Sequence, residues 1–547
     1  MDTPEVGFFV QEHICPQIRF SQEDIFDVLP ATDFQSHCVS HALLKTRGLL
    51  NYFYLDGAGV IDHQFFEQRC LQVVRDNEIL RTLFVLHEAQ FLQVVLKTFA
   101  PTIEIHQTEG DVKEFATSIC RQDVEQKLPL GEPFVKFFLV EKTDGSEHRL
   151  IMRMSHAQYD GVCLPRIWEN LVNDLDLDVA VSQAPPFSQY VRDSQLARTS
   201  ESYQYWRDLL RDSSMTNVVA HSKPAYSDVY DSRITQMTRP TSLATAGVTF
   251  ATVLKAAWAL VLAEFGVNSD VVFGHVISGR SSSTINIENI VGACVNIIPV
   301  RVAIQPGWKA LDLLQHLQEQ QLSNMPFETL GFREIFKHCT DWANYTRFSS
   351  IVQHQNIDSN RSITMGGTSY DVGSFCPMAD EADVAIMSTP CGEEMDISLS
   401  YGSGSISHEF SRELLSRLCN RIESISSDVN QSLLLPNLAT HPAPRLPLTD
   451  LGRYVEDDKV LCKAYSMSGV TSSDVIKKIE RCWKQVLDRS RMSNLELNMD
   501  TSFFEVGGDF VAVAQLSVLL ERDGLVVSPE DLIDCPRFGF QVALFTL

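Results

Sequence analysis

The segment RLIMRMSHAQYDGVCLP, residues 149–165, begins as an apolar run and ends in polar residues. Leu150, Met152 and Met154 recur at every second position, and the run is too short for an ordinary helix. This alternation predicts a buried strand that ends at Ser155. The residues that carry chemistry come directly after it.

The residues after this strand suit proton transfer and a tight turn. His156 is the only side chain of the segment whose unperturbed pKa lies near neutrality. Asp160 either forms a dyad with His156 or turns away and pairs with an arginine that fixes the loop. Gly161 lacks a Cβ, so the backbone can bend tightly and approach a ligand. A lone histidine at a strand end is more often structural, so these residues alone are a weak signal.

The motif SHAQYDG, residues 155–161, resembles the HHxxxDG signature of the condensation domains of nonribosomal peptide synthetases. His156, Asp160 and Gly161 match the second His, the Asp and the Gly. Ser155 replaces the first His, a departure shared with fungal condensation domains and terminal condensation-like domains. We expect His156 to act on the reacting groups and a backbone N–H near Gly161 to stabilise an oxyanion. Ser155 and Asp160 are assigned structural roles at the site.

Two further motifs in the first half extend the resemblance. LPATDFQ (29–35) is similar to the family's LPxTxxQ, and RDNEILRTLF (75–84) is similar to RHExLRTxF. A guanidinium can clamp a carboxylate with two hydrogen bonds, so Arg81 is our first choice as the partner of Asp160. Arg280, in VISGR, is the second choice. The alternative for Arg81 is a solvated arginine at a helix end.

The second half contains a segment, NIENIVGACVNIIPVRV (286–302), that resembles the family's Gly-x-x-x-Asn-x-x-Pro-x-Arg pattern. Asn296 either faces the cleft and hydrogen-bonds substrate or forms a turn, and the turn is the commoner role. His354 lies in a strand-like run and points to the cleft or to the core, and we favour the core. Both residues are kept as cleft candidates.

Composition excludes several classes of partner. The chain has 547 residues and a formal net charge of −25, which argues against a nucleic acid or an anionic membrane as partner. The 13 cysteines show no CxxC or Cys/His ligand spacing, which indicates a reduced, cytoplasmic protein without a metal site. There is no Walker loop, no GxGxxG after a strand and no signal peptide. We therefore expect no nucleotide, and a substrate that is activated elsewhere.

The predicted fold class is α/β with an added helical domain. We expect helices over 24–28, 33–45, 62–75 and 249–265, and a helical connector over 188–212. The resemblance implies two chloramphenicol-acetyltransferase-like lobes that form a V-shaped condensation domain. The predicted divisions are an N-terminal linker remnant (1–17), an N-lobe (18–187), a C-lobe (188–429), a proline-rich linker (430–471) and a four-helix carrier, or thiolation, domain (472–547).

The last domain resembles a phosphopantetheine carrier at one motif. DTSFFEVGGD (500–509) is similar to DxFFxxGGDS, but Phe510 stands where the serine that carries phosphopantetheine is expected. A phenyl ring has no oxygen to modify, so Phe510 is predicted to block loading. Either the residue was altered or the domain is a degenerate carrier kept for docking.

The resemblance implies a condensation reaction between an upstream carrier-bound acyl or peptidyl thioester and an amine or hydroxyl on a second carrier. The implied cofactor is 4'-phosphopantetheine on partner carriers, and the implied partners are the upstream and downstream carriers of the same synthetase. His156 either accepts a proton or only positions the nucleophile. A condensation domain followed directly by a carrier resembles the tail units of fungal siderophore synthetases, and ester or macrocycle products stay open. The alternatives are a silent docking scaffold and a free-standing acyltransferase.

Overall fold

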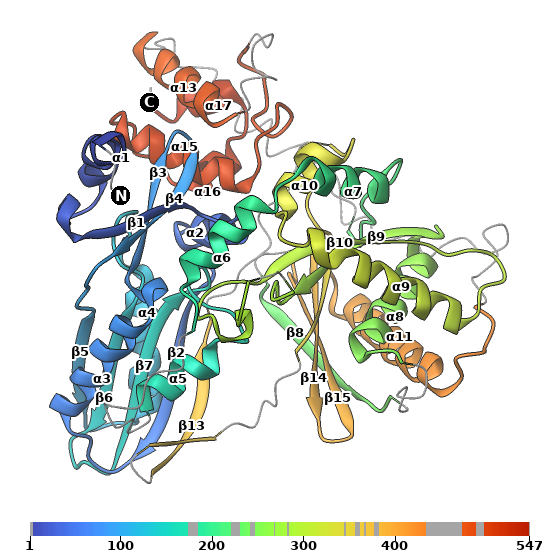
Figure 1. Cartoon of the computed structure of the whole chain (residues 1–547), viewed down its shortest axis with the longest axis horizontal. Coiled ribbons are helices and arrows are strands. Elements are labelled where there is room, and N and C mark those ends of the chain that lie inside the picture. Colours follow the sequence, from blue (N-terminus) through green and yellow to red (C-terminus); the bar gives the residue numbers. More distant parts are fainter. Residues whose placement is uncertain are drawn as a thin grey trace.

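The computed structural model describes residues 4–172, 184–219, 230–240, 247–266, 268–281, 284–343, 346–355, 362–365, 368–376, 382–433, 473–487 and 497–545. Two α/β lobes lie side by side, and a small helical domain lies against the end at which they meet (Figure 1). The lobes diverge away from that domain, as the predicted V shape requires.

The N-lobe is built on a six-stranded sheet of order β12-β13-β2-β7-β6-β5. Helices α3 (His63–Asp76) and α5 (Leu164–Val172) cover one face and share a core with Leu150, Met152 and Met154. Helix α4 (Val112–Glu125) covers the other face. The predicted strand before His156 is therefore confirmed. Four of the strands in this sheet come from the first half of the chain: β2 (Leu50–Ala58), β5 (Thr102–Thr108), β6 (Lys136–Lys142) and β7 (Glu147–Ser155).

The C-lobe has its own six-stranded sheet, of order β10-β9-β11-β14-β15-β8. Trp258 of α8 is fully buried in the core under α8, α9 and α11, and Trp206 of α7 is buried in a second core with α10. The strands are β8 (Ser232–Thr238), β9 (Asp270–Ile277), β10 (Asn296–Ala303), β11 (Ser350–His354), β14 (Val384–Cys391) and β15 (Glu394–Tyr401). The helices are α6 (Phe187–Leu196), α7 (Ser200–Leu210), α8 (Phe250–Gly266), α9 (Ala310–Asn324), α10 (Phe332–Cys339) and α11 (His408–Ser427).

Two strands cross from the second half of the chain into the first lobe. β12 (Ser362–Met365) and β13 (Thr368–Phe375) follow β11 in sequence, yet β13 pairs antiparallel with β2, with Asp371 opposite Asp56 (Figure 1). Tyr370 is buried, and its hydroxyl lies 3.2 Å from Nε2 of His148 on β7. The predicted boundary at 187/188 does not separate the two cores cleanly, because the N-lobe core includes Tyr190 and Ile290, and the N-lobe sheet is completed by residues beyond it.

The N-terminal residues are folded, which corrects the expectation of a linker remnant over 1–17. Helix α1 (Pro4–Phe9) and two short helical turns that end at Gln17 pack on a three-stranded sheet, because Val10 and Ile14 are fully buried against it. The helix expected over 24–28 is also wrong, since β4 offers pairing partners to this segment. The sheet has the order β1-β4-β3, with β1 (Ile25–Pro30), β3 (Thr82–His87) and β4 (Gln90–Leu96).

The C-terminal domain is helical, as predicted. Trp483 is fully buried and packs edge-on against Phe503 and Phe538, with ring centroids 5.0 and 5.3 Å apart. Most of the predicted linker (434–471) lies outside the described residues, but residues 429–433 run along the C-lobe, where the amide of Leu433 donates to the carbonyl of Trp308. The helices are α13 (Ser473–Val486), α15 (Phe510–Arg522), α16 (Pro529–Asp534) and α17 (Phe538–Ala543).

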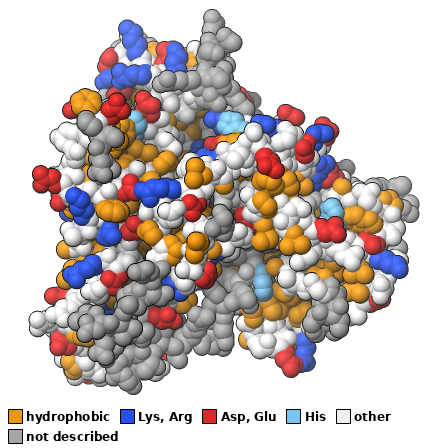
Figure 2. Space-filling view, viewed as in Figure 1, with side chains coloured by type: hydrophobic (Ala, Val, Ile, Leu, Met, Phe, Trp, Pro, Cys, Tyr) orange, Lys and Arg blue, Asp and Glu red, His pale blue; other side chains and the backbone are white. Residues whose placement is uncertain are grey.

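The distribution of charge on the surface and the apolar character of the helices bear on possible partners. On the face drawn in Figure 2, acidic and basic side chains are interspersed rather than gathered by sign. Within the ranges that the structure describes, no helix combines the length and the apolar character needed to cross a bilayer.

We expect Tyr370→Ala to lower the free energy of unfolding by about 3 kcal/mol, because it removes a buried aromatic ring that joins β13 to the N-lobe core. Val372→Ala is the matched control, since Val372 lies on the same strand with 37% of its surface exposed. Urea unfolding followed by circular dichroism measures both. Equal midpoints for the two variants would contradict the role given to Tyr370.

Candidate active site

The loop that carries His156 is held by backbone contacts from three segments of the N-lobe. β2 and β7 pair with Leu50 opposite Ser155, so the amide of His156 donates to the carbonyl of Leu49 at 2.7 Å. Gln35 closes a capping box at the start of α2 (Asp33–Ala42), and its Nε2 donates to the carbonyl of Ala157 at 3.1 Å. Nε2 of Gln158 donates to the carbonyl of Ile79 at 3.0 Å, so the motifs before α2 and before β3 both contact this loop.

The imidazole of His156 has one nitrogen engaged and one available. Nδ1 lies 2.9 Å from the carbonyl oxygen of Tyr159. A carbonyl only accepts, so Nδ1 carries the proton and Nε2 keeps its lone pair. The ring stacks on Tyr159 at 4.6 Å, meets Phe34 edge-on at 5.2 Å, and stays partly exposed. Burial lowers the pKa of His156 below 6.5, against the opposing effect of its hydrogen bond with the Tyr159 backbone, so the ring is neutral at pH 7.

Asp160 turns away from His156 and pairs with Arg280. Nη2 of Arg280 lies 3.0 and 2.8 Å from the two carboxylate oxygens, and both side chains are almost fully buried. The carboxylate also accepts the amides of Val162, Cys163 and Cys294, at 3.0, 2.9 and 3.1 Å. Of the two alternatives left by the sequence, this geometry supports the structural one.

Arg81, our first choice as the partner of Asp160, is placed elsewhere. Its guanidinium donates to the carbonyl of Leu96 on β4 rather than to the carboxylate of Asp160. That expectation is therefore corrected in favour of Arg280. The 3₁₀ turn Glu78–Arg81 leads into β3, and β4 pairs with β3 so that Thr82 lies opposite Val95, which brings the Leu96 carbonyl within reach of Arg81.

Arg280 connects Asp160 to the C-lobe. Its Nη1 donates to the carbonyls of Ile287 and Ile290, at 2.7 and 3.0 Å. Gly279, just before it, has φ +62°, and a Cβ there would stand 1.8 Å from the carbonyl oxygen of Cys294. Only glycine fits this close approach. The His156 loop of one lobe is thus fixed by a turn of the other.

The other two residues of the motif lie beside His156. Ser155 is fully buried, and its Oγ accepts the amide of Ala157 at 3.2 Å, so it shapes the loop. Gly161 is exposed at the start of the turn. The next two amides donate to Asp160, and among the hydrogen bonds described the Gly161 amide donates to no protein acceptor.

The two cleft candidates of the second half are differently placed. Asn296 is buried, and its Nδ2 donates to the carbonyls of Glu328 and Leu330 at 2.8 and 3.1 Å, so the cleft role is corrected to a loop-holding role. His354 is partly buried, with Nδ1 2.8 Å from Oγ of Ser388 and its ring 5.2 Å from Phe250. These contacts agree with the core position favoured for His354.

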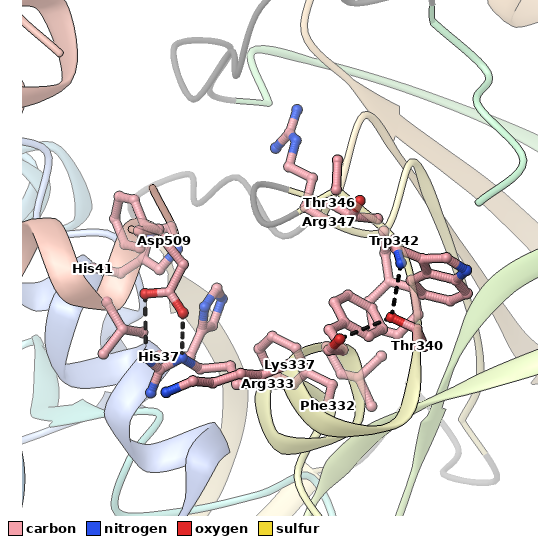
Figure 3. Close-up of a pocket in the computed structure, with 17 residues that line it drawn as sticks. His37, His41, Phe332, Arg333, Lys337, Thr340, Trp342, Thr346, Arg347 and Asp509 are labelled. Atoms are coloured by element: carbon pink, nitrogen blue, oxygen red, sulfur yellow. Dashed lines mark hydrogen bonds and ion pairs between the residues drawn. The ribbon is translucent and has the colours of Figure 1, made fainter. Parts of the chain in front are cut away.

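A cavity of about 110 Å³ lies where the helical domain meets both lobes. Figure 3 shows Asp509 against Arg333, with Trp342, Thr340 and Arg347 across the opening. The carboxylate of Asp509 accepts from Nε and Nη2 of Arg333 at 2.8 and 3.1 Å. The rest of the cavity wall includes His37, His41, Phe332, Phe336, Phe348 and Phe510.

Sequence reasoning missed one face of α2. Phe34, His37 and His41 follow one another at spacings of three and four, which places them on one side of a helix. Phe34 contacts His156, and His41 contacts Phe510 with ring centroids 4.4 Å apart. The spacing of these three residues can be read from the sequence, but only the structure shows that His156 lies at one end of the face and Phe510 at the other.

The chain matches two family models. Residues 26–441 match the condensation domain, and residues 477–539 match the phosphopantetheine attachment site. The chain therefore belongs to the condensation-domain family of acyltransferases. It is a condensation domain followed by a phosphopantetheine-attachment domain, of the kind found in fungal nonribosomal peptide synthetases.

The relatives are far longer than this chain. Nonribosomal peptide synthetase 1 of Aspergillus fumigatus is 38% identical over 98% of this chain, and nonribosomal peptide synthetase nlsA of Emericella nidulans is 36% identical over 98%. The chain spans 9% of the length of each. These proteins place the chain in its class without giving its substrate.

Solved structures support the same fold. The crystal structure of holo T3CT is 25% identical, with a TM-score of 0.67, and the match covers 79% of this chain and 98% of that one. The starter condensation domain of rhizomide synthetase RzmA, as a mutant complex with C8-CoA and Leu-SNAC, is 18% identical with a TM-score of 0.61, covering 74% and 96%. At that identity the likeness concerns the fold alone.

We expect Asp160→Asn to destabilise the protein by about 3 kcal/mol, because it leaves the buried Arg280 charge without its partner. The matched control is Asp208→Asn, which breaks an ion pair with Arg211 on the surface and should cost about 1 kcal/mol or less. Thermal unfolding compares the two variants. If Asp160→Asn melts like the wild type but loses activity, Asp160 acts in the chemistry instead.

Proposed function

We propose that this chain catalyses condensation of a carrier-bound acyl or peptidyl thioester with an amine or hydroxyl nucleophile, with His156 as the central residue. The observation that carries the proposal is the imidazole itself. Its Nδ1 is fixed by the Tyr159 carbonyl, and its neutral Nε2 is left for a substrate on a partly exposed ring. No nucleotide is required, because the thioester supplies the driving force.

In the proposed reaction the amine nitrogen attacks the thioester carbonyl carbon. Its proton moves to Nε2 of His156, or stays hydrogen-bonded to it while the nucleophile is positioned. The tetrahedral oxyanion faces the exposed amide of Gly161, and collapse breaks the carbon–sulfur bond. The proton then passes to the departing thiolate, so charge is balanced at the end of the cycle.

Most of the rate enhancement is assigned to orientation. Holding two tethered reactants in line removes about 7–11 kcal/mol in favourable intramolecular models, and general-base help adds about 10²–10⁴-fold. Asp160 takes no proton in this scheme, since Arg280 and three amides occupy its oxygens. It acts on the reaction only by holding the loop.

The partners follow from the chemistry. The reactants would be phosphopantetheine thioesters on upstream and downstream carriers, and the finer proposal is iterative use in siderophore assembly or cyclisation. We place residue 510 at the attachment position, so this chain's own carrier would hold no arm. The described cysteines are free thiols, which supports a reducing, cytoplasmic setting.

A second candidate is a docking scaffold without turnover. Phe510 favours it, because a carrier without an arm delivers no substrate. The fixed imidazole and the satisfied Asp160 favour catalysis, since a silent domain needs neither.

We expect His156→Ala to abolish product formation from a loaded donor carrier and an aminoacyl pantetheine thioester, with a loss of at least 10²-fold. The control is His63→Ala, which removes a surface imidazole that pairs with Glu141. Mass spectrometry of the product measures activity, and thermal unfolding checks that both variants fold. Unchanged turnover in folded His156→Ala would overturn the proposal and favour the scaffold.

The pH profile tests the base role. His156 must be neutral to accept a proton, and its pKa is lowered below 6.5, so kcat/KM divided at each pH by the unprotonated fraction of the amine substrate should stay level as the pH falls to 6.5 and decline only below it. The profile is measured with soluble thioesters over the range in which the protein stays folded. A decline centred above 6.5 would contradict the assignment, and a flat profile would indicate positioning alone.

A further inference from the structure

The carrier domain lies on a defined face of the condensation lobes. We call the facing surfaces of α2 and α10 the docking face. Asp509 pairs with Arg333 of α10, and the Phe510 ring lies against His41 of α2. Carrier residues and α2 residues share one apolar core, so the contact is more than a few surface charges.

Further contacts fix the carrier on the N-lobe side. Glu530 of α16 accepts the Lys45 amide at 2.5 Å, and Glu521 of α15 accepts from Nζ of Lys127 at 2.5 Å. The Lys127 pair is exposed and contributes about 1 kcal/mol at most. The partly buried Asp509–Arg333 pair, with two hydrogen bonds, is the stronger of the polar contacts.

The docking face leads to the imidazole. Phe34 touches His156 at one end of the α2 face, and His41 touches Phe510 at the other. Seven residues of helix separate the two ends, which is about 10 Å at 1.5 Å per residue. His37 lies between them, and its Nε2 and both ring nitrogens of His41 are buried without a hydrogen-bond partner among the described residues. Both rings line the cavity, so these unsatisfied nitrogens face a space in which a polar group can bind rather than a finished core.

Phe510 lies at the cavity end of this α2 face. It is 7% exposed and forms part of the cavity wall, at the residue from which an arm would extend. The helix needs no serine there, because Asp509 caps α15 by accepting the Ala512 amide at 2.7 Å. The first residue of α15 therefore presents a phenyl ring to the cavity beside the docking face.

We propose that the C-terminal domain is an autoinhibitory occupant of the docking face, which keeps acceptor thioesters away from His156 until it is displaced. This inference rests on the proposed function for its effect on turnover. The contact between the C-terminal domain and the docking face can be measured separately. It predicts that the intact chain accepts a nucleophile slowly, and that weakening the Asp509–Arg333 pair speeds acceptance without any change at His156.

The test compares Arg333→Glu, which repels Asp509, with Arg239→Glu, which reverses a charge in an exposed pair with Glu393 away from the docking face. Hydrogen–deuterium exchange over residues 33–42 and 332–339 reports docking. Affinity for a non-reactive aminoacyl pantetheine amide, measured by calorimetry in a His156→Ala background, reports access. Turnover uses an aminoacyl pantetheine thioester. This soluble substrate is attached to no carrier protein, so it requires no protein contact with the docking face.

Arg333→Glu should raise exchange over both helices and raise affinity and turnover by at least tenfold, while Arg239→Glu changes none of them. Phe510→Ala should act in the same direction and guards against a folding defect specific to Arg333→Glu. Faster exchange with unchanged affinity would overturn the inference, as would unchanged exchange in both docking-face variants. Raised affinity with no turnover in any chain would leave autoinhibition standing and overturn the proposed function.

Discussion

The buried ion pair between Asp160 and Arg280 is the contact on which the site depends. Removing two charges from water costs several kcal/mol for each, and such a pair is justified only when its remaining hydrogen bonds are satisfied. Here three amides donate to Asp160 and two carbonyls accept from Arg280, so that among the described residues only Nε of Arg280 is buried without a partner in this pair. The ion pair therefore acts mainly by fixing the geometry of the loop, and less by raising the free energy of unfolding. It fixes the loop after β7 of one lobe to a turn of the other, and this is the loop that carries His156.

The same pair decides what His156 can do. A carboxylate hydrogen-bonded to Nδ1 would raise the pKa of the imidazole and favour its charged form. The Tyr159 carbonyl takes that place instead, and it orients the ring without adding a full charge. Burial then lowers the pKa below 6.5. The outcome is a neutral, oriented imidazole, which suits a reaction in which the amine must be held unprotonated beside a thioester.

Local pattern predicted the parts of this structure that depend on neighbours in sequence. The alternation before His156 predicted β7, and the motif indicated that a loop follows it. Arg81 was wrong because the direction of a side chain leaving a 3₁₀ turn is set by β4, which no motif describes. Residues 24–28 form a strand because β4 pairs with them. The crossing of β13 to β2 was equally hidden, since strand order follows from packing between distant segments.

Residue 510 separates the fold of the carrier from its chemistry. Because Asp509 both caps α15 and pairs with Arg333, neither the helix nor the docking contact requires a hydroxyl at the next position. A phenyl ring there adds an aromatic contact with His41, and in our proposal it also removes the point of attachment. Burying such a ring contributes about 1.5–3 kcal/mol, which is comparable to the partly buried ion pair beside it. If residue 510 is the attachment position, as proposed, one side chain accounts both for the missing arm and for a firmer contact between the carrier and the docking face.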